Sequence, residues 1–91
     1  MRTWEDFKNA IKNRGGVTAE DIEEMEMLAA IVTAIIDRRN ELGLSQRDLA
    51  KKCCLPQSSV ARLEACLVRP KIETILRIMR ELGLKLIAVT K

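Results

Sequence analysis

Two short stretches decide the fold: GLSQRDLAKK at residues 43–52 and PQSSVARLE at residues 56–64. Ser45 is a preferred N-cap residue and begins a helix over residues 46–53. Pro56 suits the first turn of a second helix, because its missing N–H has no helical partner there. We therefore expect two short helices joined by a tight turn. Their inward-facing apolar residues are Leu49, Ala50, Val60 and Leu63.

Apolar periodicity extends the helical pattern on both sides. Thr18 and Asp21 have the spacing of a capping box, and a helical stripe follows them as far as Gly43. Downstream, an amphipathic helix over residues 72–82 ends at Gly83. A chain of 91 residues makes one domain, so we expect an all-α bundle of about five helices. The first of these, near the N-terminus, carries the apolar stripe Trp4, Phe7 and Ile11.

The C-terminal residues change period. Apolar and other side chains alternate over residues 84–90, which predicts a strand. A single strand is not stable alone, and the chain offers no second strand. We expect it to pair with its copy in a second protomer or with the edge of another protein; a frayed or helix-extending tail is the alternative. The expected dimer interface comprises Leu84, Leu86, Ile87, Ala88 and Val89, with Ile75, Met79 and Leu82 packed beside the strand.

Charge is segregated along the chain. Residues 1–37 carry 8 acidic and 4 basic side chains, whereas residues 38–91 carry 12 basic and 5 acidic ones. The net charge of +3 is thus the sum of −4 and +7. This asymmetry favours a nucleic-acid surface in the basic part and a different partner in the acidic part.

Composition argues against several classes of function. The chain has no His and no Gly-rich phosphate loop, so we expect no enzymatic activity and no cofactor. The odd set of Cys53, Cys54 and Cys66 is too small for a four-ligand zinc site, so we expect no metal. The longest uncharged run, residues 27–36, is too short to span a membrane, and no secretory segment opens the chain. These features predict a cytoplasmic protein with reduced thiols and no membrane partner.

The two quoted stretches resemble the XRE/Cro family of DNA-binding domains. That family reads LGLSQ-x-x-LA-x-x, then S-Q-x-x-(I/V)-x-R-(I/L)-E, then a Pro-initiated helix and LG, and the likeness covers about residues 28–83. It implies a lambda-repressor-like helix-turn-helix bundle whose second short helix enters the major groove of double-stranded DNA.

This resemblance predicts the DNA-facing residues. Gln57 can bond adenine in a bidentate manner, and Arg62 can reach guanine or a phosphate. Gln46 matches a residue that bonds a phosphate and braces the recognition helix, whereas Glu64 is expected to make a structural ion pair or hydrogen bond. The remaining Lys and Arg side chains either contact phosphates or are solvated surface charges. The full predicted set is Gln46, Arg47, Lys51, Gln57, Ser58, Ser59, Arg62, Arg69 and Lys71, with Lys52 as a further phosphate candidate.

Two positions depart from the family pattern. The family commonly has Gly after the second helix and again two residues after the Glu of the recognition helix, where this chain has Cys54 and Cys66. If the backbone is left-handed there, each side chain costs on the order of 1 kcal/mol.

Three functions compete. The chain resembles HigA-type antitoxins in its N-terminal extension, in the acidic start of its long helix and in its C-terminal strand. This resemblance implies a protein that neutralises a RelE/HigB-like ribonuclease toxin. It also implies that the protein represses its own operon as a dimer on a palindromic operator. The alternatives are a stand-alone XRE-family repressor and a protein-only scaffold. We expect three segments. Residues 1–17 form an extension that packs on the body or binds a toxin, residues 18–83 form the DNA-binding domain, and residues 84–91 form the dimerisation strand. The expected toxin-facing residues are Trp4, Phe7, Ile11, Glu20, Glu23 and Glu24.

Overall fold

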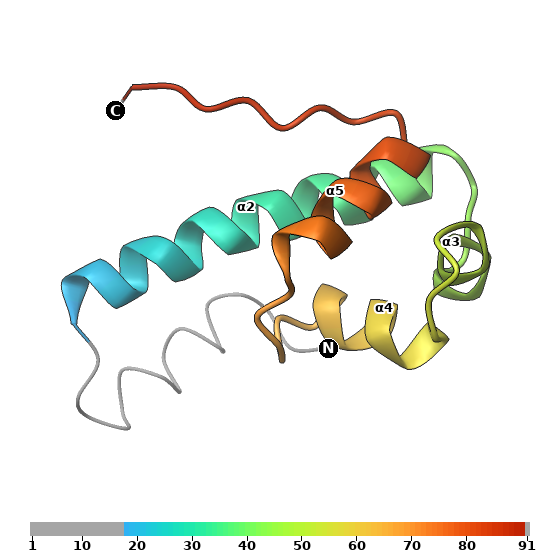
Figure 1. Cartoon of the computed structure of the whole chain (residues 1–91), viewed down its shortest axis with the longest axis horizontal. Helices are drawn as coiled ribbons and strands as arrows, with labels where there is room; N and C mark the ends of the chain where they lie inside the picture. The colour runs from blue at the N-terminus through green and yellow to red at the C-terminus, as the bar shows by residue number, and fades with distance from the viewer. Residues whose placement is uncertain (1–17, 91) are drawn as a thin grey trace.

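The computed structural model describes residues 18–90, and these residues form four helices and no strand. This confirms the all-α helix-turn-helix bundle. The helix expected around Trp4, Phe7 and Ile11 lies outside the described residues. In chain order the helices are α2 (Ala19–Glu41), α3 (Gln46–Lys52), α4 (Gln57–Glu64) and α5 (Ile72–Glu81) (Figure 1).

Both expected capping residues begin their helices. Thr18 and Asp21 form a capping box at α2, with both hydrogen bonds at 3.1 Å. Ser45 and Asp48 form a second box at α3, with hydrogen bonds of 2.9 and 3.0 Å. Pro56 differs from the prediction, because its extended backbone makes it the N-cap of α4 and not a residue of the first turn.

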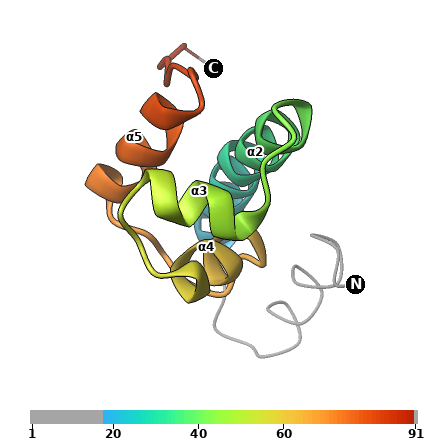
Figure 2. The same cartoon turned by 90° about the vertical axis from the view of Figure 1, so that its right-hand side faces the viewer.

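The core lies between the C-terminal half of α2 and the three shorter helices. Figure 1 shows α5 crossing that half of α2, and Figure 2 shows α3 and α4 together at one end of the molecule. Arg38 of α2 joins the two longer helices, because its Nε donates to the carbonyl of Leu82, the C-cap of α5, at 2.9 Å. The largest fully buried side chains are Ile35, Leu49, Val60, Cys53, Ile78 and Leu82.

The burial of α5 revises the expected dimer interface. Ile75 and Met79 are 3% and 5% exposed and pack in the protomer's own core, as does Leu82. They have almost no surface left to give to a second protomer. The exposed apolar residues of the same helix are instead Ile72 and Leu76.

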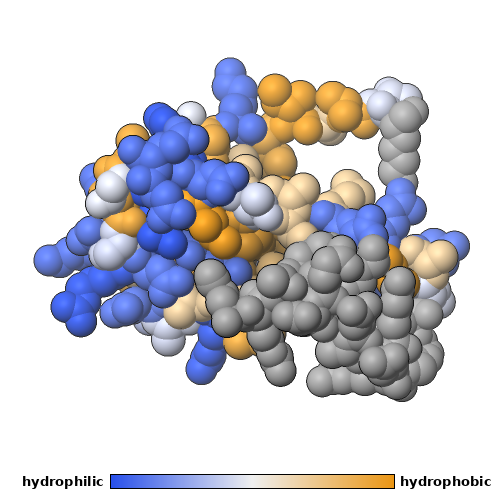
Figure 3. All heavy atoms as spheres, turned by 180° about the vertical axis from the view of Figure 1, so that it is seen from behind, coloured by the Kyte–Doolittle hydropathy of each residue, from blue (hydrophilic) through white to orange (hydrophobic). Residues whose placement is uncertain are grey.

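The tail over residues 84–90 forms neither a helix nor a strand in this single chain. It is anchored by Leu84, whose N–H donates to the carbonyl of Met79 at 2.8 Å, and then projects from the helices as an extended segment (Figures 1 and 2). Ile87 and Val89 are 70% and 82% exposed, and the tail appears as an apolar band in Figure 3. The helix-extending alternative is therefore wrong, while the frayed tail and the pairing of the tail as a strand both stay predictions.

Candidate nucleic-acid interface

The interface is built on the turn between α3 and α4. The N–H of Leu55 donates to the carbonyl of Ala50 at 2.9 Å and closes the turn. The turn requires a left-handed backbone at Cys54, with φ of 55°, and the end of α4 requires the same at Cys66, with φ of 56°. The backbone is therefore left-handed at both positions where the family commonly has glycine. This chain has cysteine at both positions, so the Cβ atoms of Cys54 and Cys66 are strained.

The outer face of α4 presents polar side chains to solvent. Val60 and Leu63 are buried against the core and fix which face of α4 is outside. The expected recognition residues all lie on that outer face and are exposed: Gln57, Ser58, Ser59 and Arg62. The same end of the molecule also carries exposed basic residues on α3, namely Arg47, Lys51 and Lys52.

A partly buried ion pair holds α4 in place. Arg39 of α2 donates from Nε and Nη2 to the two carboxylate oxygens of Glu64, at 2.7 and 2.8 Å. Its Nη1 also donates to the carbonyl of Leu44, at 2.8 Å. The side chains of Arg39 and Glu64 are only 13% and 6% exposed, so the charges are poorly screened by water.

Gln46 completes this brace between three helices. Its Nε2 donates to Oε1 of Glu64 at 3.0 Å, which ties the first residue of α3 to the last residue of α4. The structural role expected for Glu64 is thus present. Arg39 was not among the residues expected at this site, because no short-range spacing links it to Glu64 across 25 residues.

Arg47 lies against Gln57, the first residue of α4. Its Nε donates to Oε1 of Gln57 at 3.5 Å, although the two residues come from different helices. Both side chains are exposed, and Figure 2 shows the two helices that carry them next to each other. Two residues that were assigned separate contacts with DNA are therefore neighbours.

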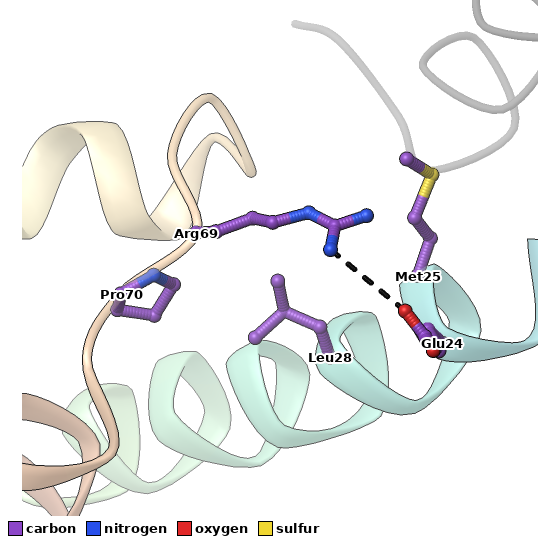
Figure 4. A pocket seen from close by; sticks show the side chains of 5 residues that line it. All are labelled: Glu24, Met25, Leu28, Arg69 and Pro70. Carbon is purple, nitrogen blue, oxygen red and sulfur yellow. Dashed lines mark ion pairs between the residues drawn. The ribbon is translucent and has the colours of Figure 1, made fainter. Parts of the chain in front are cut away.

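Arg69 and Lys71 lie on the connection from α4 to α5, away from this pair. Arg69 forms an ion pair with Glu24 of α2, with an Nη1–Oε2 distance of 3.8 Å. Beneath the pair is a shallow pocket of about 170 Å³ whose apolar lining is Met25, Leu28 and Pro70 (Figure 4). The structure thus joins a predicted phosphate contact, Arg69, to a predicted toxin contact, Glu24.

The titratable groups of the described residues fit a structural role. The hydrogen bond from the backbone N–H of Ser45 holds the pKa of Asp48 below its usual value, and Thr18 does the same for the pKa of Asp21. Burial raises the pKa of the Cys53 and Cys66 thiols, so both stay protonated near neutral pH. Among residues 18–90, no three His, Cys, Asp or Glu side chains are grouped so as to hold a metal ion. Nor is any helix of this part long and apolar enough to cross a membrane.

Comparison with known proteins places the chain in a family. The helix-turn-helix family model matches residues 35–88, which is more than half of the chain. A protein of Haemophilus influenzae described as an uncharacterized HTH-type transcriptional regulator is 31% identical over 80 residues, covering 88% of this chain and 76% of that protein. A solved structure titled "Toxin-Antitoxin module from Streptococcus pneumoniae" contains a similar chain at 30% identity, with a TM-score of 0.66 and coverage of 100% of this chain and 96% of that one. The chain therefore belongs to the XRE-type helix-turn-helix family of DNA-binding transcriptional regulators, a class without enzymatic activity.

Proposed function

We propose that the protein is an antitoxin that binds its own operator and represses its operon. The observation that carries the DNA-binding half is the outer face of α4, where Gln57, Ser58, Ser59 and Arg62 are exposed. The brace through Gln46, Arg39 and Glu64 fixes that face before DNA arrives, so little conformational entropy is lost on binding. Short polar side chains at the N-terminal turns of a helix are what major-groove reading requires.

The toxin-binding half rests on charge and on the structural relative. Residues 1–37 carry a net charge of −4, and Glu20 and Glu24 are exposed on the first turns of α2. A ribonuclease toxin of the RelE/HigB kind is basic because it binds RNA, so an acidic surface steers its association. The similar chain from a toxin–antitoxin module supports the same partner class. The proposed toxin-facing set is Trp4, Phe7, Ile11, Glu20, Glu23 and Glu24, of which the first three lie outside the described residues.

A homodimer completes the proposal. The exposed tail over residues 84–90 has no strand partner within residues 18–90, and a copy in a second protomer supplies one. The proposed interface is Leu84, Leu86, Ile87, Ala88 and Val89, with Ile72 and Leu76 of α5 in place of Ile75 and Met79. Such a two-fold dimer reads two half-sites about 34 Å apart, which requires a palindromic operator.

DNA binding is tested with the DNA upstream of the protein's own gene. Replacing Gln57 or Arg62 by Ala is expected to weaken binding by about 5- to 150-fold, the value of one good bidentate base contact. The matched control is Arg77→Ala, which removes an equal charge from an exposed site on α5. Gel-shift titration measures the affinities, and unchanged affinity in both α4 variants contradicts the groove assignment.

Toxin binding is tested with the product of the adjacent gene. We expect a basic protein of about a hundred residues, a typical size for one small domain, and a stable complex on size-exclusion chromatography. Combined Glu20→Gln and Glu24→Gln replacement is expected to slow association, because rim charges act mainly on the association rate. An adjacent product that does not bind, together with intact operator binding, favours the alternative of a stand-alone repressor.

A further inference from the structure

The contact between Arg47 and Gln57 bears on which base the protein reads. Gln57 is the first residue of α4, and Arg47 lies in the first turn of α3. The Nε of Arg47 donates to Oε1 of Gln57, with the two atoms 3.5 Å apart. The bond therefore engages the carbonyl side of the Gln57 amide.

This engagement changes what Gln57 offers to DNA. A glutamine reads adenine by using both ends of its amide: the oxygen accepts from N6 and the NH₂ donates to N7. When a guanidinium occupies the oxygen, the NH₂ is the end left to point outward. The oxygen keeps a second lone pair, but the adjacent positive charge disfavours the approach of another donor such as adenine N6–H₂.

We propose that Arg47 and Gln57 act as one reading unit that presents only donors and therefore selects guanine over adenine. Guanine offers two acceptors in the major groove, O6 and N7, whereas adenine offers one acceptor and one donor. In this unit Arg47 is a positioning and specificity residue and not merely a phosphate contact. The inference rests on the proposed groove-reading role of α4 and reverses the base first expected for Gln57.

The surrounding structure keeps the two side chains within reach of each other. Gln46, the residue before Arg47, is bonded to Glu64 at the far end of α4. The capping box of Ser45 and Asp48 fixes the turn of α3 that carries Arg47. α3 is thus held on both sides of Arg47 and is tied to α4 through Glu64, which fixes the relative placement of the two helices and keeps Arg47 and Gln57 neighbours.

The test is a selection of binding sequences from a pool of randomised DNA duplexes. The full-length wild type is expected to select guanine at one position of each half-site, and Gln57→Ala is expected to lose that preference. In Arg47→Ala the amide of Gln57 is free, so the preferred base at the same position is expected to change from guanine to adenine by at least about fivefold. Circular dichroism of each variant checks that these exposed replacements leave the helices intact.

Lys51→Ala is the matched control, because Lys51 is an exposed basic residue one turn after Arg47 on the same helix. It is expected to weaken binding to all sequences alike and to reduce the salt dependence by about one charge. If Arg47→Ala behaves like Lys51→Ala, Arg47 is a phosphate contact and the proposal is overturned. A wild type that selects adenine at this position also overturns it. A wild type that selects no sequence at all contradicts the proposed function itself.

Discussion

The two ends of α2 each carry an Arg–Glu ion pair to a distant part of the chain, and the pairs differ in burial. At the C-terminal end, Arg39 and Glu64 are 13% and 6% exposed, with the shortest N–O distance at 2.7 Å. Near the N-terminal end, Glu24 and Arg69 are both 65% exposed and 3.8 Å apart. The same two residue types therefore form one buried and one exposed ion pair in a single small domain.

The difference separates a fixed contact from an exchangeable one. Removing one partner of a buried pair leaves a charge without compensation, whereas an exposed pair contributes about 0–1 kcal/mol and is screened by salt. The buried pair places α4 against α2 and α3. The exposed pair leaves both of its charges accessible to a phosphate or to a basic protein.

The largest expected effect is the loss of the buried pair. Glu64→Gln is expected to lower the free energy of unfolding by about 3 kcal/mol, because the guanidinium of Arg39 keeps its burial but loses its countercharge. Glu24→Gln is the matched control and is expected to change it by less than about 0.5 kcal/mol. Urea unfolding followed by circular dichroism measures both. Equal effects at the two ends would remove the distinction drawn between them.

Strain at the α3–α4 turn is the next largest effect. Cys54→Gly is expected to raise the free energy of unfolding by about 1 kcal/mol, because glycine adopts a φ of 55° without a Cβ clash. Cys66→Gly should raise the free energy of unfolding by less, because the Cys66 side chain packs against the core and the variant loses that contact. Thermal unfolding of the two variants beside the wild type measures the gain. A loss of stability in Cys54→Gly would show that the cysteine side chain contributes more than its strain costs.

The capping boxes of α2 and α3 allow a comparison of how each affects the pH dependence of stability. The backbone hydrogen bonds of Ser45 and Thr18 lower the pKa of Asp48 and Asp21 in the folded state. A lowered folded-state pKa contributes stability that is present above the unfolded value of about 3.9 and is lost as the pH falls through the folded value.

Asp48→Asn should therefore flatten the acid-induced loss of stability below about pH 4. Asp21→Asn should do so less, since the first buried residue of α2, Ala29, lies far beyond Asp21, whereas the buried residues Leu49 and Ala50 directly follow Asp48. Unfolding midpoints measured between pH 2 and 7 test the difference, and identical acid profiles for the two variants contradict it.

The smallest expected effect concerns the exposed pair and DNA. If Glu24 competes with a phosphate for Arg69, Glu24→Gln should tighten operator binding by about twofold, consistent with the small energy of an exposed pair. The gain should vanish in an Arg69→Gln background, whereas a general charge effect would persist there. Glu20→Gln, which removes a charge one turn earlier on α2, is the control. Fluorescence anisotropy with labelled operator DNA resolves differences of this size.

Local signals predicted much of this structure. Thr18 and Ser45 begin helices because their partners lie three residues along, so the capping boxes are legible in the sequence. The outer face of α4 followed in the same way from the spacing of Val60 and Leu63.

Contacts between distant residues could not be found by spacing. Arg39 meets Glu64 and Glu24 meets Arg69 only through the way the helices cross. The choice between Ile75 and Leu76 as the outward-facing apolar residue of α5 likewise depends on where α2 and α3 pack. The partner of the tail depends on a second chain, so the strand at residues 84–90 stays a prediction.

The left-handed cysteines also bear on how this chain can change. Every cysteine codon is one base away from a glycine codon, so the strain at Cys54 can be relieved by a single nucleotide change. Natural proteins sit just above a stability threshold, and selection does not accumulate stability beyond it. Replacing Cys54 by glycine is therefore expected to add about 1 kcal/mol to the free energy of unfolding. That gain can offset a destabilising replacement on the outer face of α4 when the protein acquires a new operator.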